Sequence, residues 1–388
     1  MGGDPLGALD LVALREDAVS LALRGTAMAQ LGEFASARTL LVRARDAGGP
    51  LAAARCVVAL SEVEVALREL TTDIRPLEHA LVELRRAGDE QNANLARLVL
   101  ARRALLLGRL SEAVAYCGLD DAAGVPPRIR VLMELLLAEI EMRRTRASTA
   151  RRALSRAAEA LELAPVPALC TELEDGWRRL GQPVARLMRA GARTDVDLAS
   201  VEDLNTQPLL VVDACRRVAR TQECSVALSR RRVPFDLLQA LAVSWPGSAP
   251  RDELIRSTFG ARRIQDSDRV KLRVEIGRLR ALVSAVAQVE PTVHGYMLRP
   301  HAEAVVVLSP PFDGAAASLR ALLADGAAWS ASALAAALGV SVRTAQRTLH
   351  ELAEEALVLA VGSGRTTRWV LAPSMVFRTP LLLPRHSL

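Results

Sequence analysis

The chain has 388 residues, of which 50 are basic and 44 acidic, and 51% are hydrophobic but only 3% aromatic. This length suits two or three domains, and the hydrophobic content excludes wholesale disorder. Lys271 is the only lysine; it follows no glycine-rich loop and stands in a basic helical segment. This placement argues against ATPases, which need a phosphate-binding loop, and against pyridoxal-phosphate enzymes.

The basic charge lies in the second part of the chain. Residues 207–388 hold 23 basic and 15 acidic residues, whereas residues 1–206 hold 27 and 29. An anionic partner is expected to bind where the excess lies. The five cysteines lack metal-ligand spacing and are expected to be free thiols, with a redox switch as the alternative. No signal peptide and no apolar run of about 20 residues is present, which predicts a soluble, cytoplasmic protein.

Residues 11–192 follow a helical period without strand signals. Gly25 and Gly32 are seven residues apart, as are Ala37 and Ala44, and Pro50 closes this unit. Weaker copies begin near residues 80, 108 and 153, at irregular steps. The pattern resembles the tetratricopeptide (TPR) repeat, so residues 1–195 are predicted to form a TPR-like domain of about four units. Such a stack presents a groove to a peptide, a partner or its own copy, and a helical bundle without a ligand is the alternative.

Residues 196–206 lose the helical pattern and are expected to be a linker, after which the period changes to two. LLVVD, CRRVAR and ECSVALS are predicted as strands of a domain spanning residues 207–300. A helix follows over RRVPFDLLQALAVSW, and a second over PRDELIRSTFG, which begins at Pro250 and stops at Gly260. The residues expected on the buried face of the first helix are Phe235, Leu238, Leu241 and Ala242.

The segment from Asp268 to Pro300 is the most informative in the chain. It predicts an amphipathic helix and then a Val/Thr-rich hairpin, with Gly295 supplying the turn. The apolar stripe of the helix consists of Leu272, Ile276, Leu279 and Val283, and the opposite face is basic with a glycine at its centre. Together with the strands and helices before it, this order resembles the OmpR/PhoB-type winged helix.

In that family the third helix enters the major groove and the hairpin touches the minor groove. The DNA contacts that the resemblance implies are Arg262, Arg263, Arg269, Lys271, Arg273, Val274, Gly277 and Arg278. Of these, Arg262 and Arg263 would contact either the DNA backbone or an RNA polymerase subunit. The hairpin is shorter and more apolar than usual in the family. The helical repeat also takes the place of the receiver domain that would precede the winged helix in that family. A solvated charged face is the alternative interpretation of the basic helix.

Residues 310–375 predict a second unit of the same kind. A first helix is expected to stop at Gly326, and a second helix is expected to be capped by Ser330 or Ser332. The segment LGVS, with Gly339, is predicted to form a tight turn, and Ser341 is predicted to cap a third helix, VRTAQRTLHELAEEA. The residues expected to point inward in this last helix are Val342, Ala345, Leu349 and Leu352. A hairpin with GSGR at its tip follows.

This order resembles the DeoR/MarR-like winged helix. The implied DNA contacts are Ser341, Arg343, Thr344, Gln346, Arg347, His350, Arg365 and Arg368. Binding to protein is the alternative for this unit. The apolar, proline-broken tail, residues 376–388, is expected to pack on a neighbouring domain or a second protomer.

The sequence therefore predicts a mainly α protein, with a TPR-like repeat followed by two winged helix-turn-helix domains of α+β type. It resembles bacterial transcription regulators that bind specific double-stranded DNA. The repeat domain is expected to bind a partner, an effector or a second protomer, as in a homodimer. The alternative is an interaction scaffold whose winged helices bind protein. No paired carboxylates, catalytic triad or metal cluster is evident, so no enzyme activity, catalytic residue, cofactor, metal or membrane partner is expected.

Overall fold

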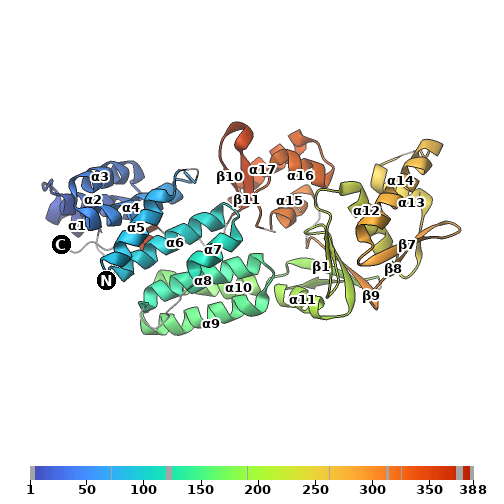
Figure 1. The fold of residues 1–388 in the computed structure, drawn as a ribbon, viewed down its shortest axis with the longest axis horizontal. Coiled ribbons are helices and arrows are strands. Elements are labelled where there is room, and N and C mark those ends of the chain that lie inside the picture. The colour runs from blue at the N-terminus through green and yellow to red at the C-terminus, as the bar shows by residue number, and fades with distance from the viewer. Residues whose placement is uncertain are drawn as a thin grey trace.

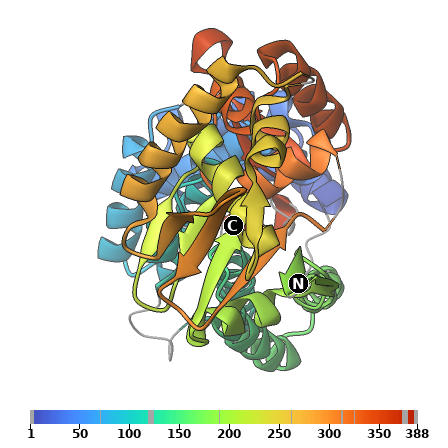
Figure 2. The ribbon, with the colours of Figure 1, turned by 90° about the vertical axis from the view of Figure 1, so that its right-hand side faces the viewer.

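The computed structural model describes residues 5–70, 72–118, 125–189, 191–261, 263–311, 314–324, 326–372 and 379–384. Within these residues the chain is mainly helical, and strands occur only from residue 185 onward. Figure 1 shows the helical part at one end, a sheet beside it, and further helices at the other end and along the top. Figure 2 shows the sheet end facing the viewer, with the first helices behind it.

The first ten helices form one array, called the helical array below. Its helices are α1 Pro5–Val12, α2 Ala18–Gln30, α3 Phe34–Ala47, α4 Pro50–Ala66, α5 Arg75–Arg86, α6 Glu90–Leu106, α7 Leu110–Cys117, α8 Pro127–Arg143, α9 Ala147–Leu163 and α10 Pro167–Leu180. Consecutive helices pack on one another, and α2, α4, α6 and α8 also contact in series. The inner face of the array is therefore built from alternate helices.

Small residues allow these helices to pack closely. A Cβ atom placed on Gly25 would lie 2.7 Å from Cγ of Leu41, so only glycine lets α2 approach α3 this closely. Ala37 and Ala44, seven residues apart on α3, are fully buried, as is Ala153 on α9. The seven-residue spacing found in the sequence therefore marks several buried contact positions, although Gly32 and Ala87, counted with them, are exposed.

The helical prediction is wrong at the end of the array. Two paired strands, β1 Ala185–Arg189 and β2 Ala192–Val196, stand there rather than helix. The expected linker is also structured, because α11 Leu198–Asp203 and a 3-10 turn over 204–206 occupy it. Asp197 caps α11 through the amide of Ser200 (2.9 Å), and Glu202 accepts a 2.7 Å hydrogen bond from the amide of Ser148 on α9. The sheet thus begins directly against the helical array.

The six-stranded sheet has the order β2-β1-β9-β3-β4-β5. Its remaining strands are β3 Leu209–Asp213, β4 Val218–Arg220, β5 Ser225–Ala227 and β9 Ala304–Ser309. β9 runs parallel to β3, whereas the other pairs are antiparallel. The central β9 and β3 are almost wholly buried, which explains their continuous apolar runs. Asp213, fully buried at the end of β3, accepts hydrogen bonds from the amide of Cys215 (2.9 Å) and from Arg220 (3.1 Å).

Between β5 and β9 the chain forms three helices and a three-stranded sheet, called the first unit below. Its elements are α12 Arg232–Ser244, β6 Ser248–Pro250, α13 Arg251–Phe259, α14 Asp266–Val283, β7 Ala287–Pro291 and β8 Gly295–Pro300. The short β6 pairs with β8 of the hairpin. The four residues predicted on the buried face of α12 are buried, and they share one core with the apolar stripe of α14.

The last part of the chain repeats this plan and is called the C-terminal unit. Its elements are α15 Ala315–Leu323, α16 Ala331–Leu338, α17 Val342–Glu354, β10 Val358–Val361, a 3-10 turn over 364–366, and β11 Arg368–Leu371. Trp329 pairs with Trp369 through two backbone hydrogen bonds of 2.9 and 2.7 Å, so a third extended segment flanks this hairpin as β6 does in the first unit. The short α18, Thr379–Leu382, lies against α2, α4 and α6 of the helical array.

Candidate nucleic-acid interface

The sequence-predicted stripe fixes the orientation of α14. Leu272, Ile276, Leu279 and Val283 are all buried, at most 1% exposed, whereas the residues opposite them are exposed. Gln265 and Asp268 form a capping box at its start, and Gly260 ends α13 at φ 68°. The outer face of α14 is thus held rigidly away from the core.

That outer face combines an apolar strip with basic flanks. Val270 and Val274 are 55% and 50% exposed, and a Cβ atom on Gly277 would meet nothing within 4 Å. The predicted contact residues on α14 are all exposed: Arg269, Lys271, Arg273, Val274, Gly277 and Arg278. A flat strip with cations at its edges is suited to a surface that carries phosphates on both sides of a groove.

The basic residues of α14 differ in whether they already contact another side chain of the protein. Arg278 donates to Glu275 (2.6 Å), and Arg269 lies 3.5 Å from Asp266. The Lys271 ammonium lies 4.3 Å from the centroid of the Phe259 ring. Arg273 has no ion pair among the residues that the structure describes. Arg273 is therefore the cation of α14 that can reach a phosphate or a base edge without first breaking a contact.

The loop before α14 places one further predicted cation. Arg263 is exposed. Arg262 lies outside the described residues. Arg280, also on α14, instead donates to the carbonyl of Val289 on β7 (2.7 Å) and so ties the helix to the hairpin.

The hairpin β7–β8 is held by a residue that sequence reasoning missed. The Arg251 guanidinium donates to the carbonyls of Val293 (2.7 Å) and Thr292 (3.0 Å), and it lies 5.5 Å from the centroid of the Tyr296 ring. Pro250, just before it, had suggested only a helix start. Because Arg251 fixes the hairpin turn from outside, no local pattern in the hairpin reveals it.

Gly295 has a different role from the one predicted. Its backbone does not adopt a positive φ, so the turn does not require glycine there. A Cβ atom at this position would lie 1.8 Å from the carbonyl oxygen of Ala249 on β6. The glycine is needed because two strands pass at close range. The turn tip itself carries Val293, 84% exposed, and His294, rather than arginine or lysine.

In the C-terminal unit, α17 presents a second polar face. Arg343, Gln346, Arg347 and His350 are exposed, and Ala345, Leu349 and Leu352 are buried. The expectation that Val342 points inward is wrong, because it is 45% exposed. Val342 is the first residue of α17. Thr348, which was not predicted to point inward, is buried in this helix as well.

Several predicted polar residues of this unit already have partners. The Ser341 hydroxyl caps α17 by accepting from the amide of Thr344 (3.0 Å), and the two hydroxyls lie 2.8 Å apart. The His350 ring packs edge-on against Trp369, with 5.4 Å between ring centroids. Arg347 lies 3.6 Å from Glu351, an exposed pair of little energetic weight. Ser341 and Thr344 therefore position the helix, and the arginines remain the residues best able to reach a ligand.

The hairpin β10–β11 ends in the predicted GSGR tip. Gly362 and Gly364 have φ values of 86° and 55°, a conformation that favours glycine. Arg365 and Arg368 are both exposed, and Arg368 donates to the carbonyl of Thr367 (3.0 Å). This tip carries the basic side chains that the tip of the first hairpin lacks.

The two units touch at the turn between α16 and α17. Gly339 has φ 69°, as predicted, and a Cβ atom there would lie 2.1 Å from the Arg232 guanidinium carbon. Arg232 also lies 3.2 Å from Asp236 on α12. Burial raises the pKa of Asp236, although Arg217 and Arg232 act against this shift. The contact fixes how α17 lies relative to the first unit, and both α14 and α17 lie along the upper side in Figure 1.

A cleft of about 620 Å³ lies where the helical array, the six-stranded sheet and the C-terminal unit meet. Arg143 of α8 borders it and donates to Glu139 (2.9 Å) and to the carbonyl of Leu371 on β11 (3.2 Å). Arg179 of α10 borders it as well. Each of these two guanidinium groups has a buried nitrogen, Nη1, without a hydrogen-bond acceptor among the described residues. The remaining lining includes apolar residues such as Val184, Leu198 and Leu308. It also includes five further charged residues, Glu139, Asp195, Asp213, Arg216 and Arg320.

No family model, no curated protein and no solved structure matches this chain. Among the helices that the structure describes, none is both long and apolar enough to cross a membrane. The described residues also contain no group of three or more His, Cys, Asp or Glu side chains arranged to hold a metal ion.

Proposed function

We propose that this protein is a transcription regulator that binds specific sequences of double-stranded DNA. In this proposal the helical array is a TPR-like repeat, the first unit is an OmpR/PhoB-type winged helix, and the C-terminal unit is a second winged helix. The observation that carries it is the outer face of α14, where exposed Lys271, Arg273 and Arg278 surround an open glycine on a rigidly held helix. The major groove of B-DNA is wide enough to admit an α-helix with its side chains.

The order of elements supports the same conclusion. In both units a short extended segment pairs with the hairpin that follows the third helix. This arrangement places a hairpin beside the helix, where it can reach the backbone or the adjacent minor groove. Because the first hairpin lacks exposed cations at its tip and the second carries Arg365, we propose that minor-groove or backbone contact belongs to the second.

Salt dependence tests DNA binding. If Lys271, Arg273 and Arg278 of α14, with Arg343, Arg347 and Arg365 of the second unit, each release one counterion, affinity should fall about a thousandfold between 50 and 200 mM salt. Fluorescence titration of a labelled duplex over this range measures the slope. Binding that is absent at about 50 mM salt, or that does not change with salt, refutes the proposal.

The alternative function is an interaction scaffold whose winged helices bind protein. Exposed valines favour it: Val270 and Val274 on α14, and Val342 at the start of α17. Apolar contact with thymine methyl groups gives these valines a role in DNA binding as well. A chain that captures a partner protein but binds no duplex would establish the scaffold. The proposal also includes RNA polymerase as a partner near Arg263, and assembly as a homodimer.

The cleft between the helical array, the six-stranded sheet and the C-terminal unit favours the binding of a small-molecule effector there. Its lining is mostly apolar, and four arginines, Arg143, Arg179, Arg216 and Arg320, outnumber its three carboxylates, a combination that suits an amphipathic organic anion. Anilinonaphthalene sulfonate serves as the probe. Arg179→Gln should weaken its binding, whereas Arg178→Gln should not, because Arg178 lies next along α10 but outside the cleft lining and is exposed. Equal binding by both variants would remove the effector proposal.

A further inference from the structure

Residues 379–384 follow the C-terminal unit but pack on the helical array, whose helices are distant in sequence. Residues 379–384 read TPLLLP, and α18 within them contacts α2, α4 and α6. Leu382 is 1% exposed and belongs to the main core of the array. Leu383 is 4% exposed and joins a separate cluster with Leu41 and Leu60. Two adjacent leucines thus enter two different apolar sites on one face.

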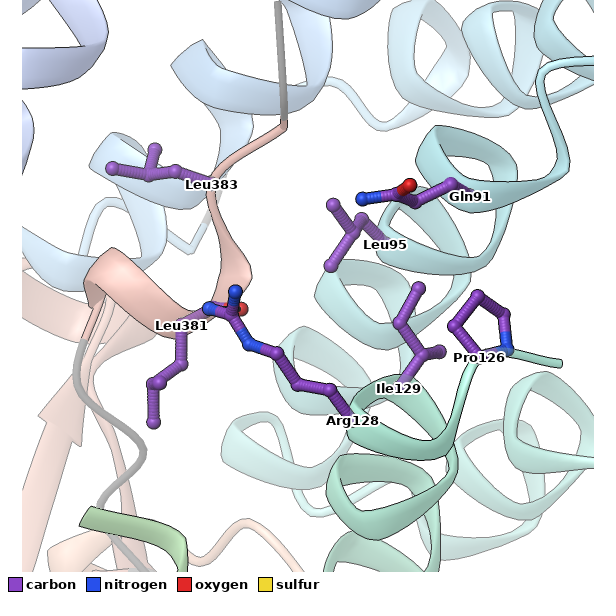
Figure 3. Close-up of a pocket in the computed structure, with 7 residues that line it drawn as sticks. All are labelled: Gln91, Leu95, Pro126, Arg128, Ile129, Leu381 and Leu383. Carbon is purple, nitrogen blue, oxygen red and sulfur yellow. Dashed lines mark hydrogen bonds between the residues drawn. The ribbon is translucent and has the colours of Figure 1, made fainter. Parts of the chain in front are cut away.

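A polar contact fixes the position of this segment. The Arg128 guanidinium on α8 donates to the carbonyl oxygen of Leu381 (3.3 Å). In Figure 3 Arg128 points toward this carbonyl, and Leu95 and Ile129 lie across from Leu381 and Leu383. The face that receives the segment therefore offers apolar sites and a backbone-binding cation, which are the features of a peptide-binding groove.

The segment fills the groove incompletely. A cavity of about 70 Å³ remains between Leu381 and Leu383 on one side and Gln91, Leu95 and Ile129 on the other. Atoms that border such a cavity lose packing contacts on that side. A peptide with a larger side chain at this position could fill the space and bind more tightly than the native segment.

We propose that the face built from α2, α4 and α6, with Arg128 of α8 at its edge, is a binding groove for short leucine-rich peptide segments. Residues 379–384 of the same chain occupy it as an internal ligand. A partner protein that carries such a segment binds the array by displacing this tail. The inference goes beyond the proposed function and does not depend on DNA binding.

Competition between the tethered tail and a free peptide tests the proposal. A tether gives the tail an effective concentration in the millimolar range, so a micromolar peptide should not displace it from the unmodified chain. Leu382→Asp places a carboxylate in an apolar site and should release the tail. A fluorescent peptide of residues 376–388 should then bind at least tenfold more tightly to this variant, and to Leu383→Asp, than to the unmodified chain.

The matched control is Leu14→Asp, the same change at a leucine of the array that is 96% exposed. It should behave as the unmodified chain does. If Leu382→Asp and Leu383→Asp retain their helical circular dichroism but bind the peptide no more tightly than this control, the groove is not a peptide site and the proposal fails.

A cross-link in the otherwise unchanged chain tests occupancy without disturbing the anchors. Gln91→Cys and Leu381→Cys together should react with a short bismaleimide, because both side chains border the same cavity. Each single variant is the control for reaction at the native cysteines. Mixing isotope-labelled and unlabelled protein should give links within one chain only. An absent link would refute the docked tail, and a link between copies would refute its assignment as an internal ligand.

Discussion

Gly277→Ala separates a DNA-facing helix from a merely solvated one, because the two roles predict opposite effects. Gly277 lies within α14 and is exposed, and a Cβ atom there has no neighbour within 4 Å. The free protein should therefore gain the helix propensity of alanine over glycine, about 0.8–1.0 kcal/mol. Against DNA the same methyl group should intrude where the helix backbone lies closest to the duplex. Overpacking of a close interface costs about 1–3 kcal/mol, which is about 5- to 150-fold in affinity.

Two measurements on the same protein give the answer. Chemical denaturation should show a more stable first unit, and fluorescence titration of a duplex should show weaker binding. Gly49→Ala is the control, because Gly49 lies in the helical array and a Cβ atom there also meets nothing within 4 Å. It should leave DNA affinity unchanged. If Gly277→Ala is more stable and binds DNA as well as the unmodified chain, α14 does not lie against DNA, and the reasoning is refuted.

Three further predictions concern other parts of the chain. Arg343→Ala on α17 should weaken duplex binding by about 1–3 kcal/mol, and unchanged affinity would assign α17 to protein contacts. Gly295→Ala should destabilise the first unit by about 1–3 kcal/mol in denaturant titration, since its Cβ would lie 1.8 Å from a backbone oxygen of β6; an unchanged midpoint would contradict this. At pH 8 a thiol reagent should modify only the half-buried Cys170 and Cys224 in the folded chain, because burial raises the pKa of the other three thiols to about 11 or 12; rapid reaction of all five would show the burial to be wrong.

Local patterns predicted the elements where a single physical requirement dominates. The stripe of α14, the strand LLVVD and the left-handed glycines at 260 and 339 each follow from periodicity or from one backbone constraint. The seven-residue spacing of Ala37 and Ala44 likewise located a buried helix contact. Such features depend on few residues that are close in sequence, so the sequence alone is sufficient.

Features that depend on distant partners were missed. The hairpin 185–196 is stabilised by pairing with β9, more than 100 residues later, and its own residues are mostly polar or exposed. Arg251 donates to the turn of the hairpin β7–β8, and Arg232 packs against the turn at Gly339. Both contacts are made outside the helix that carries the arginine, so no spacing rule identifies them. Gly295 was recognised as special, but its cause, the approach of Ala249, required the paired strand. The predicted contact residues were placed on exposed faces, but which of them already have partners required the three-dimensional structure.

Selection of bound duplexes from a random DNA library tests the central claim most directly. The full chain should enrich a defined sequence, and two reading units should give two conserved segments at a fixed separation. Arg273→Ala should relax the preference in one segment, and Arg343→Ala in the other. A library that remains random after several rounds at about 50 mM salt, with folded protein, would contradict sequence-specific DNA binding.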